Sequence, residues 1–103
     1  MTRVDYEPSS LSLTVEGHAG AGRRGEDLVC AALSILTATL EAAVLDRKER
    51  LLPAVGKGPG RVRISCRPEP ASRGLCRSIF ETVFTGFELL SSCYPEHVQT
   101  KRI

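Results

Sequence analysis

Residues 11–45 read LSLTVEG, HAGAGRRG and EDLVCAALSILTATLEAAVL, and the spacing of their apolar residues changes along the way. Leu11, Leu13 and Val15 alternate with polar residues, which is typical of a strand with one buried face. Three glycines in residues 20–25 interrupt this pattern and predict a mobile loop. Residues 26–45 are rich in alanine and leucine and contain no breaker, so they predict a long helix.

The helix predicted over residues 26–45 has faces of different character. Its apolar face comprises Leu28, Val29, Ala32, Leu33, Leu36, Leu40 and Val44. A second stripe of polar or small residues comprises Asp27, Cys30, Ser34, Thr37 and Glu41. A small-residue edge, where another helix or another subunit can approach closely, comprises Ala31, Ala38 and Ala42. Cys30 is therefore expected off the apolar face, among polar neighbours.

The flanking segments extend this pattern to both ends of the chain. Residues 2–6 alternate and precede the turn-forming run Glu7-Pro8-Ser9-Ser10, which predicts a hairpin with the strand that follows. Residues 46–60 are charged and then rich in glycine and proline, which indicates a connecting loop. Residues 61–67 alternate as a strand, residues 71–93 have helical periodicity, and residues 97–103 suggest a short final strand.

The predicted element order is therefore ββαβαβ within a single domain of residues 1–103. Strands with one polar face combined with two amphipathic helices favour an α+β, two-layer sandwich. We expect a mixed four-stranded sheet with both helices on one of its faces. Its polar face would meet solvent or a partner.

Composition excludes several classes of protein. The 103 residues are 42% hydrophobic and 25% charged with a net charge of +2, which is ordinary for a soluble domain and too mild for a nucleic-acid-binding tail. No run reaches the ~18 apolar residues of a membrane span, and the start of the sequence lacks a secretory signal. We therefore expect a cytoplasmic protein without membrane contact. Its four cysteines are expected to stay reduced and contain no C-x-x-C pair, which argues against a zinc site or other cofactor.

A candidate for chemistry is formed by His18, at the end of the predicted strand, and Cys30, near the start of the predicted helix. A nucleophilic cysteine acts as its thiolate, which a helix N-terminus and a nearby imidazolium both favour. The backbone N–H groups of that helix end could stabilise an oxyanion during acyl transfer. Spacing alone is weak evidence, because a surface histidine and an inert buried cysteine occur in most proteins.

The run Gly17-His18-Ala19, followed by the glycine-bearing loop and by Asp27-Leu28-Val29-Cys30-Ala31-Ala32-Leu33-Ser34, resembles the signature of the ribosomal-processing cysteine protease family Prp. The resemblance implies that His18 and Cys30 are catalytic, and that Asp27 and Ser34 support the site. It implies a substrate loop containing Gly20, Gly22 and Gly25 that moves when substrate binds. It also implies a homodimer that trims the N-terminal extension of large-subunit ribosomal protein twenty-seven after a short segment with aromatic residues. No direct nucleic-acid contact is expected.

The mechanism that these residue types suggest is thiol proteolysis. His18 would take or share the proton of Cys30, and the thiolate would attack the scissile carbonyl. Asp27 is a candidate to orient His18, and capping of the helix is an equally good interpretation of this residue. For Ser34, a hydroxyl that bonds back to a helix carbonyl is at least as good an interpretation as a role in the site.

Two other functions compete with proteolysis. One is a non-catalytic module that binds the ribosome or RNA through Arg61, Arg63 and Arg67, although its five tyrosines and phenylalanines are few for base stacking. The other is a metal or redox protein that uses Cys93 with His97, or Cys30 with His18. Binding that weakens steeply with salt would favour the first function, and metal analysis of untagged protein would test the second.

Overall fold

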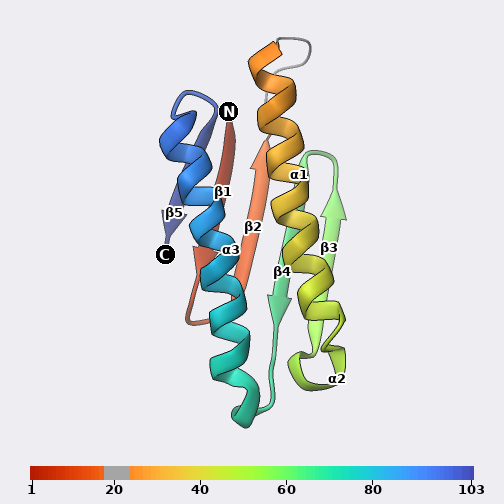
Figure 1. Ribbon diagram of the computed structural model, residues 1–103. Coiled ribbons are helices and arrows are strands. Elements are labelled where there is room, and N and C mark those ends of the chain that lie inside the picture. Colours follow the sequence, from red (N-terminus) through yellow and green to blue (C-terminus); the bar gives the residue numbers. More distant parts are fainter. Residues whose placement is uncertain (18–23) are drawn as a thin grey trace.

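The computed structural model describes the backbone of residues 1–17 and 24–103, and the side chains of residues 1–17 and 28–103. Figure 1 shows two long helices lying side by side over one sheet. In chain order the elements are β1 (Thr2–Glu7), β2 (Ser12–Gly17), α1 (Arg24–Leu45), α2 (Lys48–Leu51), β3 (Pro53–Gly58), β4 (Arg61–Cys66), the 3₁₀ turn η1 (Pro70–Ser72), α3 (Arg73–Cys93) and β5 (Val98–Arg102). The predicted α+β, two-layer arrangement is confirmed.

The sheet is mixed, as predicted, and has five strands in the order β3-β4-β2-β1-β5. The hairpin of β1 and β2 is antiparallel, with Val4 opposite Val15, and β2 continues antiparallel to β4, with Leu13 opposite Ile64. The final strand β5 pairs parallel with β1, so that Val98 lies opposite Thr2. The chain returns to this edge through α3, which gives the crossover that a parallel pair needs.

The prediction of a connecting loop over residues 46–60, and hence of four strands, is wrong because this segment holds α2 and the edge strand β3. Pro53 occupies the first position of β3, and Gly56 and Gly58 follow within it, so the local sequence has weak strand propensity. Pairing with β4 overrides this weakness and places Val55 opposite Ile64. An edge strand tolerates proline because one side of its backbone makes no ladder hydrogen bonds.

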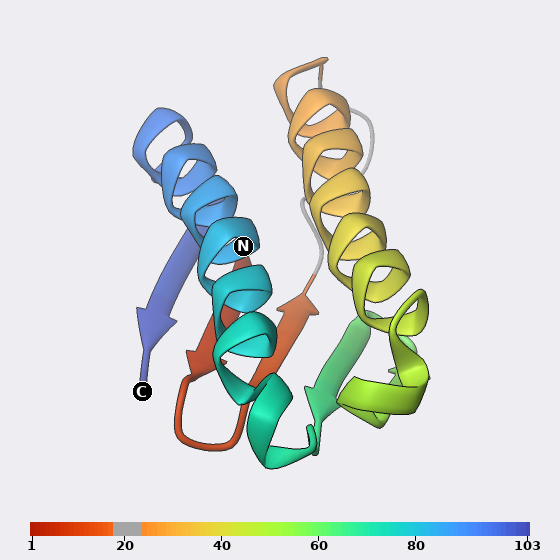
Figure 2. The ribbon, with the colours of Figure 1, turned by 60° about the horizontal axis from the view of Figure 1, so that its bottom comes forward.

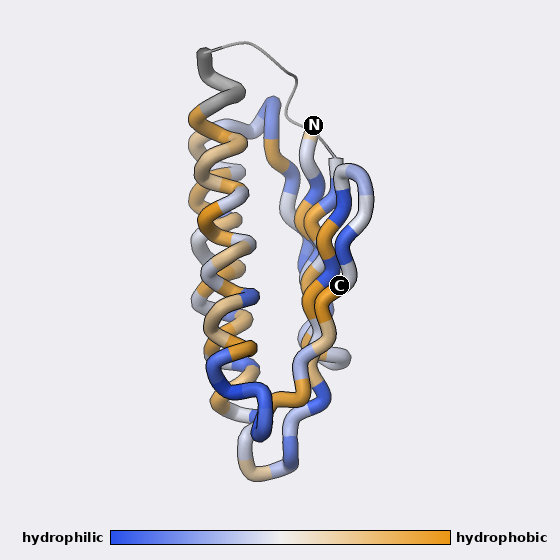
Figure 3. Tube along the Cα trace, turned by 90° about the vertical axis from the view of Figure 1, so that its right-hand side faces the viewer, coloured by the Kyte–Doolittle hydropathy of each residue, from blue (hydrophilic) through white to orange (hydrophobic). Residues whose placement is uncertain are grey.

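Figures 2 and 3 show the two long helices on one face of the sheet, and the buried core residues come from both layers. From α1 it receives Val29, Leu33, Leu40 and Val44, and from α3 it receives Cys76, Phe80, Val83, Phe84 and Phe87. The helices approach closely where Leu36 of α1 lies over Gly86 of α3, since a Cβ on Gly86 would come within 2.6 Å of a Leu36 methyl. Gly86 therefore permits close packing of the two helices.

Leu28 was predicted on the apolar face of its helix, and Leu75 is placed on the buried face by the helical period of residues 71–93; both are exposed, so these predictions are wrong. Leu28 has 66% of its surface exposed, and Leu75 is also exposed. Each immediately precedes a buried residue, Val29 or Cys76, and consecutive residues in a helix differ by about 100° around its axis. The sheet therefore receives only the second residue of each pair.

The expectation that no segment is long and apolar enough to cross a membrane is also wrong. The 18 residues Leu28–Leu45 of α1 are long and apolar enough to cross a membrane, with a mean hydropathy of 2.1, and 22% of this stretch is buried. Its buried members pack on the sheet with the other core residues. Such stretches also occur in helices that cover the core of a soluble domain. The unusual property of α1 is therefore the apolar character of the face turned away from the sheet.

A polar cluster joins α3 to the edge of the sheet at β5. The Arg102 guanidinium donates two hydrogen bonds to the Glu81 carboxylate, at 2.9 and 2.7 Å. The buried Tyr6 hydroxyl donates to the same carboxylate at 2.7 Å. Arg102 also lies over the rings of Tyr6 and Phe84, at 5.2 and 5.4 Å from their centroids. Glu81 is therefore the acceptor through which three elements of the fold are tied together.

These hydrogen bonds, first from Arg102 and then from Tyr6, lower the pKa of Glu81 from 4.5 to about 2, although partial burial opposes the shift. A carboxylate whose pKa is lower in the folded state stabilises the fold above its unfolded pKa. We expect this contribution to be complete above about pH 4.5 and to be lost as the pH falls towards 2. Urea unfolding at a series of pH values measures the loss, which should be shallower in Glu81→Gln. Identical pH profiles for the two proteins would contradict the prediction.

Candidate active site

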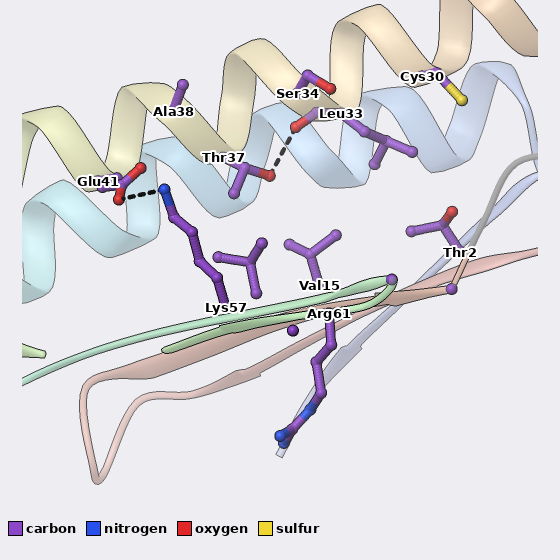
Figure 4. Close-up of a pocket in the computed structure, with 14 residues that line it drawn as sticks. Thr2, Val15, Cys30, Leu33, Ser34, Thr37, Ala38, Glu41, Lys57 and Arg61 are labelled. Atoms are coloured by element: carbon purple, nitrogen blue, oxygen red, sulfur yellow. Dashed lines mark hydrogen bonds and ion pairs between the residues drawn. The ribbon is translucent and has the colours of Figure 1, made fainter. Parts of the chain in front are cut away.

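A cleft of about 470 Å³ opens between α1 and the β2, β3 and β4 strands, and Figure 4 shows it from the side. Its helical wall follows one face of α1, from Cys30 through Leu33, Ser34 and Thr37 to Glu41. The opposite wall is built from Val15, Val62 and Lys57 together with Gly58 and Gly60. The cleft is therefore a groove along the helix with an apolar centre. Cys30 lies at one end and a pair of charges lies at the other.

Cys30 is half-buried, packs against the edge of the core and points into the groove above Thr2 (Figure 4). Because α1 begins at Arg24, Cys30 is its seventh residue and not part of the first turn. The predicted helix begins at Glu26, so Cys30 lies two residues farther from the observed helix start than expected. The field of a helix dipole falls off within the first turn, and only the first four N–H groups lack a helical partner. Direct activation of Cys30 by the helix end is correspondingly weakened.

The other three cysteines do not line the groove, and none of the four is in a disulfide. Cys66 and Cys76 are buried in the core, and burial raises the pKa of Cys66 to about 12 and also raises the pKa of Cys76. Cys93 is exposed at the last residue of α3 and is not among the residues that line the groove. Of the four, Cys30 is the thiol that lines the groove.

This placement predicts selective alkylation of the folded protein by iodoacetamide. At pH 8 a thiol with a pKa of about 12 is ionised to only about one part in 10⁴, and burial also blocks the reagent. We expect Cys30 and Cys93 to be labelled, and Cys66 and Cys76 to react only after unfolding. Peptide mass spectrometry measures the labelling at each position. Labelling of Cys66 as fast as Cys93 in the folded protein would show that this part of the core opens.

The remaining residues predicted for the site are only partly within the described chain. His18, Gly20 and Gly22 lie outside the described residues, as does the side chain of Asp27. Gly25, predicted in the loop, lies instead in the first turn of α1, so that prediction is wrong because the helix starts at Arg24. α1 therefore begins two residues before Glu26, where the predicted helix starts.

Gly17 fixes the direction in which the chain leaves β2 towards His18. Its φ angle of +108° lies in the region that favours glycine, and an added Cβ would run into the Met1 carbonyl. Its N–H donates to the Gly60 carbonyl at 2.8 Å, which ties the end of β2 to the β3–β4 turn. Gly17 itself lines the groove. The glycine that precedes His18 is therefore a structural requirement at the same end of the groove as Cys30.

Ser34 and Thr37 lie on the same wall of the groove as Cys30. Ser34 is four residues after Cys30, so both side chains share one helix face. Thr37 donates its hydroxyl to the Leu33 carbonyl at 2.7 Å, which is the backbone-bonding role common for helical threonines. Of the two hydroxyls, Ser34 is therefore nearer to the thiol and remains the candidate for a supporting role.

The far end of the groove holds an ion pair that the sequence did not reveal. Lys57 of β3 approaches Glu41 of α1, with 3.0 Å between Nζ and Oε1 (Figure 4). Glu41 was predicted on the polar stripe of the helix, but Lys57 was assigned to a loop. The alternation of Pro53, Val55 and Lys57 is the signal that could have placed Lys57 on the inward face of a strand.

One of the arginines that motivate the RNA-binding alternative lies close to acidic groups. Arg61 points away from the groove in Figure 4, and its guanidinium lies 3.9 Å from Glu16. Glu16 also lies 3.8 Å from Arg3, so acidic and basic groups alternate on the uncovered sheet face. Within the described part of the chain, no three histidine, cysteine or acidic side chains gather as a metal site. The groove at Cys30 is thus the better candidate for function.

Comparison with known proteins identifies relatives of the whole chain. A family model described as cysteine protease Prp matches residues 1–99. Two structures of the essential ribosomal processing protease Prp from S. aureus, one with a covalently linked product peptide and one with a substrate peptide, each match with a TM-score of 0.81 and 19% identity over 100% of both chains. SMU.848 from Streptococcus mutans matches with a TM-score of 0.72 and 24% identity over 99% of this chain and 91% of its own. Comparison with curated protein sequences finds no match.

Proposed function

Because this chain belongs to the Prp family of cysteine proteases, we propose that it removes the N-terminal extension of large-subunit ribosomal protein twenty-seven. The observation that carries the proposal is the position of Cys30, the thiol among four that lines a peptide-sized groove. The matching S. aureus protein is a ribosomal processing protease that was captured with a substrate peptide. We take residues 1–103 as one protease domain. Thiols without disulfides favour a cytoplasmic site of action, where a ribosomal protein is met.

In the proposed reaction, His18 accepts the proton of the Cys30 thiol and the sulfur attacks the scissile carbonyl carbon. The tetrahedral intermediate expels the amine, which takes its proton from the His18 imidazolium. Water then attacks the thioester while His18 accepts one of its protons, and the released sulfur recovers its proton. Asp27 supports His18 or the first turn of α1, and Ser34 supports the neighbouring thiol. Gly20 and Gly22 give the substrate loop its freedom, with Gly25 at its junction with α1.

A direct test uses the intact ribosomal protein from the same organism. Purified enzyme is incubated with the protein carrying its extension and, as the matched control, with the protein from which the extension has been deleted. We expect intact mass spectrometry to show one cut in the first protein and none in the second. Cleavage of both proteins at scattered sites, or of neither, would reject the proposed function.

Support for a homodimer comes from the outer face of α1. The seam on this face consists of exposed residues at alternating three- and four-residue steps, namely Leu28, Ala31, Ile35, Ala38, Ala42 and Leu45. Ile35 and Leu45 are 65% and 45% exposed. This spacing is that of a coiled-coil seam, and its alanines allow two helices to approach closely. A second copy of the chain offers the same seam, as a two-fold interface requires.

The seam predicts that Ile35→Lys produces a monomer. A lysine at its centre would bring two like charges together at the helix–helix contact and would leave them desolvated there. Sedimentation velocity should show twice the chain mass for the wild type and a single chain mass for the variant at the same concentration. Leu89→Lys is the matched control, since Leu89 is 63% exposed on α3 and outside the seam. A dimeric Ile35→Lys protein, or a monomeric wild type, would contradict the prediction.

A further inference from the structure

Glu41 and Lys57 are isolated charged residues in the helix and the strand that contain them. Glu41 is the one charged residue between Leu28 and Leu45 of α1. Lys57 is on the inward face of β3, in register with Val62 of β4, where the neighbouring inward residues are apolar. The two exceptions meet across the groove, with 3.0 Å between Nζ and Oε1. Lys57 is likewise the one charged residue of β3, so the pair brings together the isolated charges of two segments.

A second inward-facing cation shows what a purely structural pair looks like in this fold. Arg102 of β5 makes two hydrogen bonds to Glu81, which also accepts from the buried Tyr6 hydroxyl, and its guanidinium is stacked over two rings. The pair of Lys57 and Glu41 differs, because both residues line the groove that begins at Cys30. The Lys57 side chain is 61% exposed, whereas that of Glu41 is 22% exposed. The accessible charge at this end of the groove is therefore the ammonium.

The distance along α1 between Cys30 and the Lys57–Glu41 pair can be expressed as a number of residues of a bound peptide. Glu41 follows Cys30 by eleven residues along α1, which corresponds to about 16 Å of helix. An extended peptide advances by about 3.3 Å per residue, so about five residues span this length. The neighbours of Lys57 on β3 are Gly56 and Gly58, and a Cβ built on either would meet nothing within 4 Å. The approach of a peptide to the ammonium is thus open.

We propose that Lys57, held in place by Glu41, is a specificity-determining residue that recognises an acidic side chain of the peptide substrate four to six residues from the scissile bond. This inference rests on the proposed function, because it assigns the substrate to the groove at Cys30. An ammonium has three N–H donors, and its contact with Glu41 leaves others for a second carboxylate. The ammonium is exposed, so water screens such a contact and its contribution to affinity is modest.

The experiment measures kcat and KM on a set of peptides spanning the cleavage site. In separate peptides, each of the six positions on either side of the scissile bond carries aspartate, asparagine or lysine. The enzymes are the wild type, Lys57→Met, and the charge-swapped double variant Glu41→Lys with Lys57→Glu. The matched control is the double variant Arg50→Glu with Glu69→Arg, which swaps a pair 3.7 Å apart that does not line the groove.

We expect the wild type to prefer aspartate over lysine about tenfold in kcat/KM at one position four to six residues from the bond, chiefly through KM. The preference should vanish in Lys57→Met, should invert in the charge-swapped variant and should persist in the control. If the ion pair served only to hold β3 against α1, the charge swap would restore it without any change in substrate preference. A wild type indifferent to charge at all these positions, or the same preference in the swapped enzyme, would overturn the inference. Failure of the wild type to cut the parent peptide would instead reject the proposed function, and the inference with it.

Discussion

Replacing Cys30 with alanine is expected to lower kcat/KM for the extension peptide by about 10⁴- to 10⁶-fold, because no covalent intermediate can then form. Cys66 and Cys76 are buried in the core with raised pKa values and cannot substitute for it. Cys93 is at the far end of α3 and does not line the groove. A stopped assay followed by mass spectrometry measures the residual rate.

Cys93→Ala is the matched control for this prediction and should retain the wild-type rate. Because Cys30 is half-buried at the edge of the core, its replacement by alanine removes little packing. The thermal midpoint of Cys30→Ala should therefore remain close to that of the wild type. Cleavage by folded Cys30→Ala within tenfold of the wild-type rate would show that the nucleophile is elsewhere.

Replacing Glu81 with alanine is expected to lower the free energy of unfolding by about 2–4 kcal/mol. The Tyr6 hydroxyl is fully buried and would lose its acceptor, and Arg102 would lose both of its hydrogen bonds. A buried donor without a partner costs about 1–3 kcal/mol, and hydrogen bonds to charged groups contribute about as much again. Partial exposure of Arg102 allows it to regain water and limits the loss.

Urea unfolding at pH 7 measures this difference. Glu88→Ala is the matched control, since Glu88 is exposed on the same helix and the gain in helix propensity is the same. We expect that control to lie within about 0.5 kcal/mol of the wild type. Equal stability of the Glu81→Ala and Glu88→Ala proteins would show that the cluster contributes nothing to the fold.

Much of the fold follows from short-range patterns in the sequence. The alternation of Val4 and Tyr6, and of Leu13 and Val15, predicts the hairpin because a strand repeats every two residues. The apolar face predicted for the helix over residues 26–45 includes Val29, Leu33 and Leu40, which are buried in the structure. β3 escaped prediction because its own proline and glycines favour a turn, although it forms a hairpin with β4, the next strand along the chain.

The site could be predicted in its chemistry but not in its shape. Cys30, on a polar stripe of the helix, was recognised from the order of residues around it. The groove depends on where β3 and β4 lie relative to α1, which no local pattern determines. Lys57 therefore appeared only once β3 was placed. The start of α1 at Arg24 was also missed, because a glycine at residue 25 argues locally against a helix.

The apolar outer face of α1 shows how one helix can satisfy two requirements. Its inner side supplies core residues such as Val29 and Leu40, while Leu28 and Ile35 face outwards. A helix that is apolar all round needs a second covering surface, which a partner subunit would provide. The same composition that gives α1 its high hydropathy therefore supports the proposed dimer.

The proposed reaction requires the Cys30 sulfur to attack the substrate, and a peptidyl chloromethyl ketone built on the cleavage sequence tests this requirement. Residual activity and the modified residue are followed together by mass spectrometry during inactivation. We expect one alkyl group per chain on Cys30, loss of activity in proportion to that modification, and much slower alkylation in His18→Ala. Full activity in protein whose Cys30 is completely alkylated, or inactivation through another residue, would contradict the proposed reaction.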